Sequence, residues 1–86
     1  MNVQAAAISL QGQSFVVVLV GMDLIDNPGE ADMTIDTVQP GFGGVPVVLM
    51  AQREDGSPRY CGDAALLELL RGVPVEQMPW KEYPVG

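Results

Sequence analysis

The chain has no histidine, one cysteine and four basic side chains among 86 residues. Histidine is the commonest general base and metal ligand near neutral pH, so its absence disfavours many catalytic and metal chemistries. The single cysteine, Cys61, excludes an intramolecular disulfide and a zinc ribbon. No remaining pattern resembles a catalytic, nucleotide or metal motif. We therefore predict no catalytic residue, no metal site and no cofactor, and we expect that the protein is not an enzyme.

Basic residues are scarce, and acidic residues dominate the first half of the chain. Four Lys and Arg against eleven Asp and Glu give a net charge of −7, and Arg53 is the first base. Five acids precede it: Asp23, Asp26, Glu30, Asp32 and Asp36. This charge repels nucleic acids and anionic membranes. The acids lack the spacing of a calcium-binding loop, so a solvated face is the favoured interpretation, and an acidic face for a basic partner or a cation is the alternative.

Long apolar runs are also absent. The longest, residues 15–20, is far shorter than the roughly 20 residues that a membrane-spanning helix needs. No basic residue precedes the first apolar stretch, which disfavours a secretory signal. We expect a cytoplasmic protein that has one domain over residues 1–86 and no contact with membrane or nucleic acid.

The first half of the chain predicts a hairpin followed by a helix. Residues 3–10 alternate in character, a turn follows at 11–13, and residues 15–20 are apolar on both faces, as in a central strand. Asn27 and Pro28 are typical of a helix start, with apolar residues recurring up to position 38 and Pro40 ending the run. A strand over residues 33–38 is the alternative, because this stretch is rich in β-branched residues.

The second half predicts a strand, a hairpin and a helix. Residues 45–51 are again apolar on both faces, and Asp55-Gly56 is a strong hairpin signal that leads into an edge strand at 57–61. Asp63 caps a helix over residues 63–71, and Gly72 closes it. The tail from residue 73 contains three prolines, which indicates irregular structure. The predicted fold is α/β (α+β), in the order β-β-α-β-β-α, with a four-stranded mixed sheet and two helices.

The segment from Gly43 to Gly72, with Pro46 directly before its first strand, resembles the C-terminal half of the thioredoxin fold. In that family the proline at this position is cis and faces the active site, whereas a trans Val45–Pro46 bond is our expectation, since few X–Pro bonds are cis. The chain has no Cys-x-x-Cys, so the resemblance does not extend to redox chemistry. As a whole, the chain also resembles small bacterial proteins that lack an assigned activity.

Five side chains are the candidates for function. Phe42 lies in a glycine-rich loop and Met78, Trp80 and Tyr83 lie in the tail, where they either pack on their own sheet or contact a partner. Cys61 precedes a helix cap, where a thiol can become reactive, although an inert structural cysteine is the favoured interpretation.

We expect a non-enzymatic protein-interaction or assembly module that forms a homodimer, because a small apolar domain gains burial by pairing. The alternative is a thioredoxin-like or thiol-dependent binding protein that uses Cys61 near Pro46. A third hypothesis is an acidic adaptor for a basic protein partner.

Overall fold

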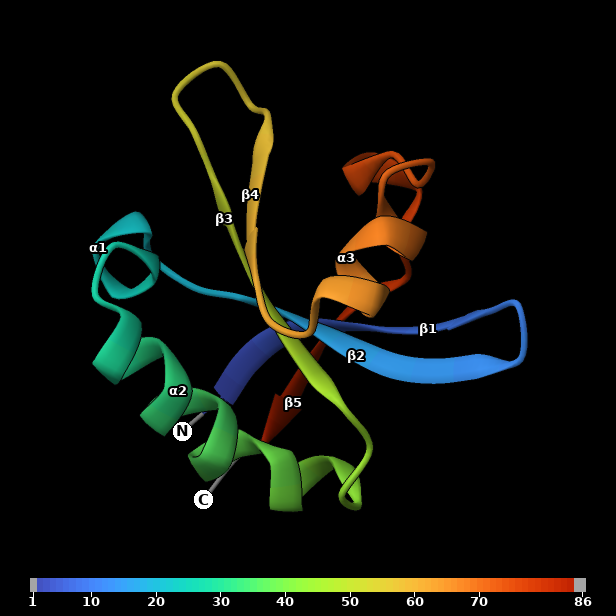
Figure 1. The fold of residues 1–86 in the computed structure, drawn as a ribbon, viewed down its shortest axis with the longest axis horizontal. Coiled ribbons are helices and arrows are strands. Elements are labelled where there is room, and N and C mark those ends of the chain that lie inside the picture. Colours follow the sequence, from blue (N-terminus) through green and yellow to red (C-terminus); the bar gives the residue numbers. More distant parts are fainter. Residues whose placement is uncertain (1, 85–86) are drawn as a thin grey trace.

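A computed structural model describes residues 2–84. Five strands form one sheet (Figure 1): β1 (Asn2–Leu10), β2 (Gln13–Leu19), β3 (Val47–Gln52), β4 (Pro58–Cys61) and β5 (Trp80–Pro84). The helices are α1 (Met22–Ile25), α2 (Pro28–Val38) and α3 (Ala64–Leu70), and the two 3-10 turns are η1 (Gln39–Phe42) and η2 (Val75–Gln77). The described part of the chain is therefore a small α+β domain with a mixed sheet.

The strands lie in the order β4-β3-β2-β1-β5. The pairs β1–β2, β1–β5 and β3–β4 are antiparallel, whereas β2 and β3 are parallel. The predicted N-terminal hairpin and the edge position of β4 are confirmed, and the parallel pair β2–β3 is joined through α1 and α2. Residues 33–38 belong to α2, so the strand alternative for them is wrong.

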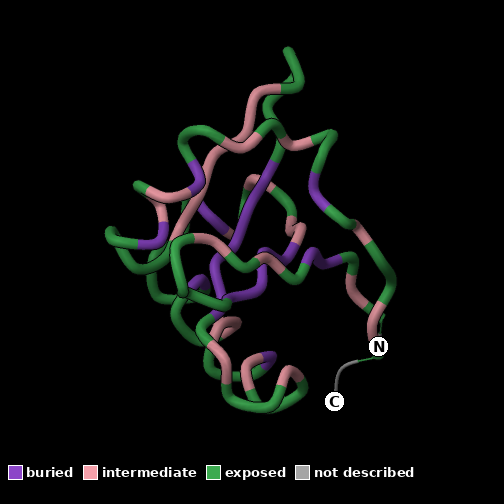
Figure 2. Tube along the Cα trace, turned by 90° about the vertical axis from the view of Figure 1, so that its right-hand side faces the viewer, coloured by how far each residue is buried: buried purple, intermediate pink, exposed green. Residues whose placement is uncertain are grey.

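The helices cover both faces of the sheet (Figure 1). Odd-numbered residues of β2 such as Phe15 and Val17 point towards α3 and η2, and even-numbered ones such as Val16 and Val18 point towards α1 and α2. All four of these side chains are buried. Figure 2 shows the buried segments gathered at the centre of the molecule. This is the physical reason for the two-sided apolar runs, since a strand between two helical layers has no polar face.

The prediction of four strands and an irregular tail is wrong. Residues 80–84 form β5, which pairs with the outer edge of β1 from Asn2↔Pro84 to Ala6↔Trp80. A neighbour on both sides places β1 inside the sheet, and its Ala5 and Ala6 are fully buried. The prolines do not prevent this strand, because Pro84 occupies its last position, on the sheet edge.

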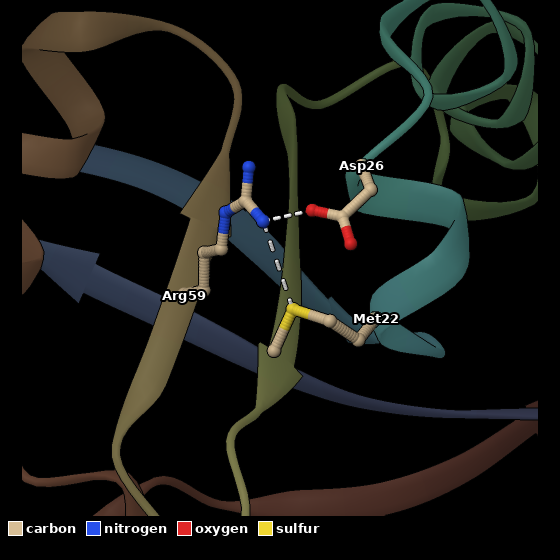
Figure 3. A network of polar contacts seen from close by, with 3 residues as sticks. All are labelled: Met22, Asp26 and Arg59. Atoms are coloured by element: carbon tan, nitrogen blue, oxygen red, sulfur yellow. Dashed lines mark hydrogen bonds and ion pairs between the residues drawn. The ribbon is translucent and has the colours of Figure 1, made fainter.

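A third helix, α1, is absent from the predicted element order. It follows β2 directly and lies against β3 and β4. Arg59 of β4 forms an ion pair with Asp26, which caps the C-terminus of α1, and the Arg59 guanidinium also lies 3.9 Å from the Met22 sulfur (Figure 3). Four residues are too few to form a stable helix alone, so packing against the sheet accounts for α1.

The helix starts are only partly as predicted. Asn27 occupies the N-cap of α2 and Pro28 the first position, but the Asn27 side chain makes no capping hydrogen bond. Its backbone oxygen accepts from the Ala31 N–H at 3.0 Å. At α3, the Asp63 carboxylate accepts from the Ala65 N–H at 2.8 Å, so this cap is confirmed.

Candidate interaction surface

The four candidate interaction residues do not form one patch. Phe42 and Tyr83 pack on the side of the sheet that carries α2, whereas Met78 and Trp80 pack on the side that carries α3. Met78 is buried in the second core, with 5% of its surface exposed. The tail therefore packs on its own sheet, which is the first of the two alternatives for these side chains.

Trp80 anchors the segment before β5. Its indole Nε1 donates to the Val75 carbonyl at 2.9 Å, which holds η2 against the sheet. The same ring lines a cavity of about 250 Å³ together with Gln4, Gln52 and Glu76. Because Trp80 is partly buried and makes an intrachain hydrogen bond, it is a structural residue on the side of the sheet that carries α3 and η2.

A groove runs along the other side of η2. It has a volume of about 560 Å³ and lies between the β3–β4 hairpin and the loop after α3. Tyr60 lines it, and the Tyr60 hydroxyl is buried without a hydrogen-bond partner among the described residues. Burial raises the pKa of this phenol above its ordinary value of 10.0, because the charged phenolate is poorly solvated there.

Cys61 and Pro46 are brought together. Both line a depression of about 310 Å³, with Asp63 and Leu66 from the start of α3 and Asp32 from α2. Cys61 is half-buried and packs against the core beneath α2. The described chain contains no cis peptide bond, so the expected trans Val45–Pro46 bond is confirmed.

The outer face of α2 carries an apolar side chain in solvent. Met33 is 69% exposed, and it is the one large hydrophobic side chain so exposed within residues 2–84. Helical geometry explains its position, because Met33 lies roughly 140–160° around the axis from the inward-facing residues Ala31, Ile35 and Val38. The spacing of those three residues predicts the helix and therefore also which side of it faces outwards.

Two threonines extend this apolar face. The Thr34 hydroxyl donates to the Glu30 carbonyl and the Thr37 hydroxyl to the Met33 carbonyl, each at 2.8 Å. A threonine whose hydroxyl bonds to the preceding turn directs its polar atom to the backbone and leaves its methyl group to the surface. Both threonines therefore add apolar surface beside Met33.

The face is hollowed where α1 meets α2. Leu24 of α1 and Val38, Met33, Thr34 and Thr37 of α2 line a depression of about 290 Å³, and Glu30 stands at its rim. We call this set, with Glu30, the α2 face. An apolar hollow with a charged rim is typical of the centre of a protein interface. Met33 is not among the candidates that the sequence suggests, because a pattern cannot show that no other element covers it.

Comparisons with known proteins do not add a relative. The chain matches no protein-family model, no curated protein and no solved structure. No helix within residues 2–84 is long and apolar enough to cross a membrane.

Proposed function

We propose that this chain is a non-enzymatic protein-interaction module that binds its partner with the α2 face. The observation that carries the proposal is the exposure of Met33 beside an apolar hollow. Fully burying a methionine side chain contributes roughly 1.5–3 kcal/mol, so a contact at this position would tighten a complex about ten- to hundredfold. The unbranched methionine side chain also adapts its shape to a partner surface, which makes it well suited to an interaction site.

The homodimer remains a prediction, and the covered sheet does not add support to it. An uncovered apolar sheet face would invite a second copy, but α1 and α2 cover one face and α3 and η2 the other. Pairing through the α2 face would set the acidic α2 helices of two copies against each other, since α2 carries three acids and no base. Sedimentation equilibrium tests the homodimer directly, and a dimer that Met33→Gln dissociates would make the second copy the partner.

The test of the proposed function is capture from the native host with matched variants. We expect wild-type protein to retain a partner that Met33→Gln loses, and the purified pair to reassociate with the same dependence on Met33. Gln13→Ala, at an exposed position on the β1–β2 hairpin, is the control and should retain the partner. A set of captured proteins that is identical for all three chains would overturn the proposal.

A second candidate function uses Cys61. The shared depression of Cys61 and Pro46 supports thiol-dependent binding in the manner of thioredoxin-like proteins. Alkylation of Cys61 at neutral pH tests this candidate. A rate above that of the unfolded chain, suppressed by a bound peptide, would support it, whereas a rate at or below the unfolded value would exclude it.

A further inference from the structure

We infer that the partner of the α2 face is a cationic amphipathic helix, an inference that rests on the proposed function. The first observation is the charge around Met33. Glu30 and Asp36 lie three residues before and after it, so each stands about one turn away, roughly 60° to either side of Met33 around the axis of α2. Glu30 is on the flank that lines the hollow, and Asp36 is on the other flank. Both residues are exposed, and Asp32 adds a third acid to the helix.

The second observation is that these acids have no basic partner within the described chain. The ion pairs of residues 2–84 are Arg59–Asp26 and Arg71–Glu68. Arg53, a further base, donates to Ser57 and to the Pro58 carbonyl in the β3–β4 hairpin. The carboxylates of α2 are therefore available to a basic group from outside, and they exclude anionic partners by repulsion.

The shape of the face selects a helix as the occupant. The depression lies beside the 11-residue helix α2, and Leu24 of α1 forms its other wall. An amphipathic helix that lies along such a depression places an apolar side chain into the hollow. Lysine or arginine one turn from that anchor would then meet Glu30 beside the hollow, and a second basic residue would reach across Met33 to Asp36. The fitting pattern is a basic residue, two of any type, an apolar anchor, two of any type and a second basic residue.

A second copy of this chain and an anionic lipid surface fit less well. Each copy carries a net charge of −7, and its α2 face offers acids to acids. A membrane surface with anionic headgroups has the same sign. Charge complementarity thus distinguishes the occupants, because only a basic partner gains from Glu30 and Asp36.

The test uses three fluorescent synthetic peptides of about 15 residues, a length at which a helix can form. The first combines a leucine stripe with flanking lysines, the second replaces lysine by glutamate, and the third has the composition of the first in an order without an apolar stripe. Binding is followed by fluorescence anisotropy at low and high salt. We expect the first peptide to bind most tightly, and high salt to weaken it.

Matched variants separate a docking site from general attraction to an acidic protein. Glu30→Gln/Asp36→Asn and Glu54→Gln/Glu76→Gln remove the same two charges, the second pair at exposed positions away from α2. We expect the first pair to weaken the leucine–lysine peptide about tenfold and to flatten its salt dependence, and the second pair to have a smaller effect. Met33→Gln should weaken it by a similar factor.

The outcomes distinguish the inference from the proposed function. If the two charge-matched pairs of substitutions weaken binding equally, or if the glutamate peptide binds as tightly as the lysine peptide, the partner is not selected by positive charge and the inference is wrong. The proposed function would still stand if a host partner depends on Met33. If the third peptide, which has no apolar stripe, binds as tightly as the first, the partner need not be an amphipathic helix. Wild-type affinity of Met33→Gln for both the peptide and the host partner would overturn both proposals.

Discussion

The ring of Tyr83 in β5 meets the ring of Phe42 in η1 edge to face, with the ring centroids 5.3 Å apart and the planes at 71°. This contact joins β5 to η1, the turn that directly follows α2. Edge-to-face pairs contribute about 0.5–1.5 kcal/mol beyond the area that they bury.

We therefore predict that Phe42→Leu and Tyr83→Leu each destabilise the protein, and that the double variant loses less than the sum of the two. The difference should be about 0.5–1.5 kcal/mol, the energy of the ring contact. Urea unfolding of the four chains measures it as a double-mutant cycle. Strict additivity would show that the two rings contribute only their separate burial.

Gly62 should not tolerate a β-carbon. An alanine there would place its Cβ 3.3 Å from the Cα of Val48, which belongs to the fully buried centre of β3. Because the contact is with backbone in a central strand, the neighbour cannot move away cheaply. Gly62→Ala should destabilise the protein by about 1–3 kcal/mol, the usual cost of overpacking.

The control for Gly62 is Gly21→Ala. An alanine Cβ at position 21 would have no heavy atom within 4 Å, and the φ of −74° there is one that alanine adopts readily. Thermal unfolding should leave Gly21→Ala near wild type. Equal stability of Gly62→Ala and wild type would mean that β3 and the β4–α3 connection can separate without cost.

The ion pair between Arg59 and Asp26 should contribute little. The two side chains are 41% and 54% exposed, and exposed pairs are worth about 0.2–1 kcal/mol and are screened by salt. Asp26→Asn should therefore reduce stability slightly at low salt and less at high salt. Urea unfolding at both salt concentrations checks this, with Glu68→Gln as a comparison because its pair with Arg71 is more exposed. A loss that high salt leaves unchanged would assign the effect to something other than the ion pair or the helix cap, since Asn retains the backbone N–H with which residue 26 caps α1.

The β3–β4 hairpin should weaken in acid. The Ser57 hydroxyl and the Ser57 N–H donate to the Asp55 carboxylate at 2.7 and 2.9 Å. These bonds hold the pKa of folded Asp55 below its ordinary value of 3.8, because they stabilise the ionised form. The bond from the Ser57 hydroxyl contributes most to this lowering. The stabilisation is complete above the unfolded pKa and is lost as the pH falls through the folded pKa.

An NMR titration of the Asp55 carboxyl group should therefore give a midpoint below 3.8. Ser57→Ala should move that midpoint upwards, because it removes the hydroxyl that contributes most to lowering the pKa. A midpoint that stays in place in Ser57→Ala would assign the lowered pKa to the other groups around Asp55, with the Ser57 backbone N–H first and Arg53 after it.

The centre of the sheet can be predicted from the sequence, and its second edge cannot. Residues 15–20 and 45–51 are apolar on both faces, and such runs have few alternatives to a covered strand. Trp80 to Pro84 is a short segment with two charges between its aromatic residues, so its strand form depends on the neighbouring edge of β1. The signal that could have revealed it is the placing of Trp80 and Tyr83, since aromatic residues favour strands.

The candidate interaction surface can also be predicted only in part from the sequence. The period of Ala31, Ile35 and Val38 predicts which side of α2 is buried, and Met33 then falls on the opposite side. That Met33 stays uncovered depends on the path of the tail, which runs beside β1 instead of over α2. Phe42 and Tyr83 illustrate the converse, because two residues that look suited to a partner are paired with each other.

The pairing of β1 with β5 has a kinetic consequence. Asn2 lies opposite Pro84, so this ladder closes a loop that spans nearly the whole described chain. The entropy of such a closure must be lost before its contacts are gained, and proteins rich in distant contacts fold slowly. The other four strands can assemble through nearer contacts, and we expect the last strand to dock afterwards. Until then the outer edge of β1 offers unpaired backbone groups, which makes that intermediate the species most exposed to strand exchange between chains.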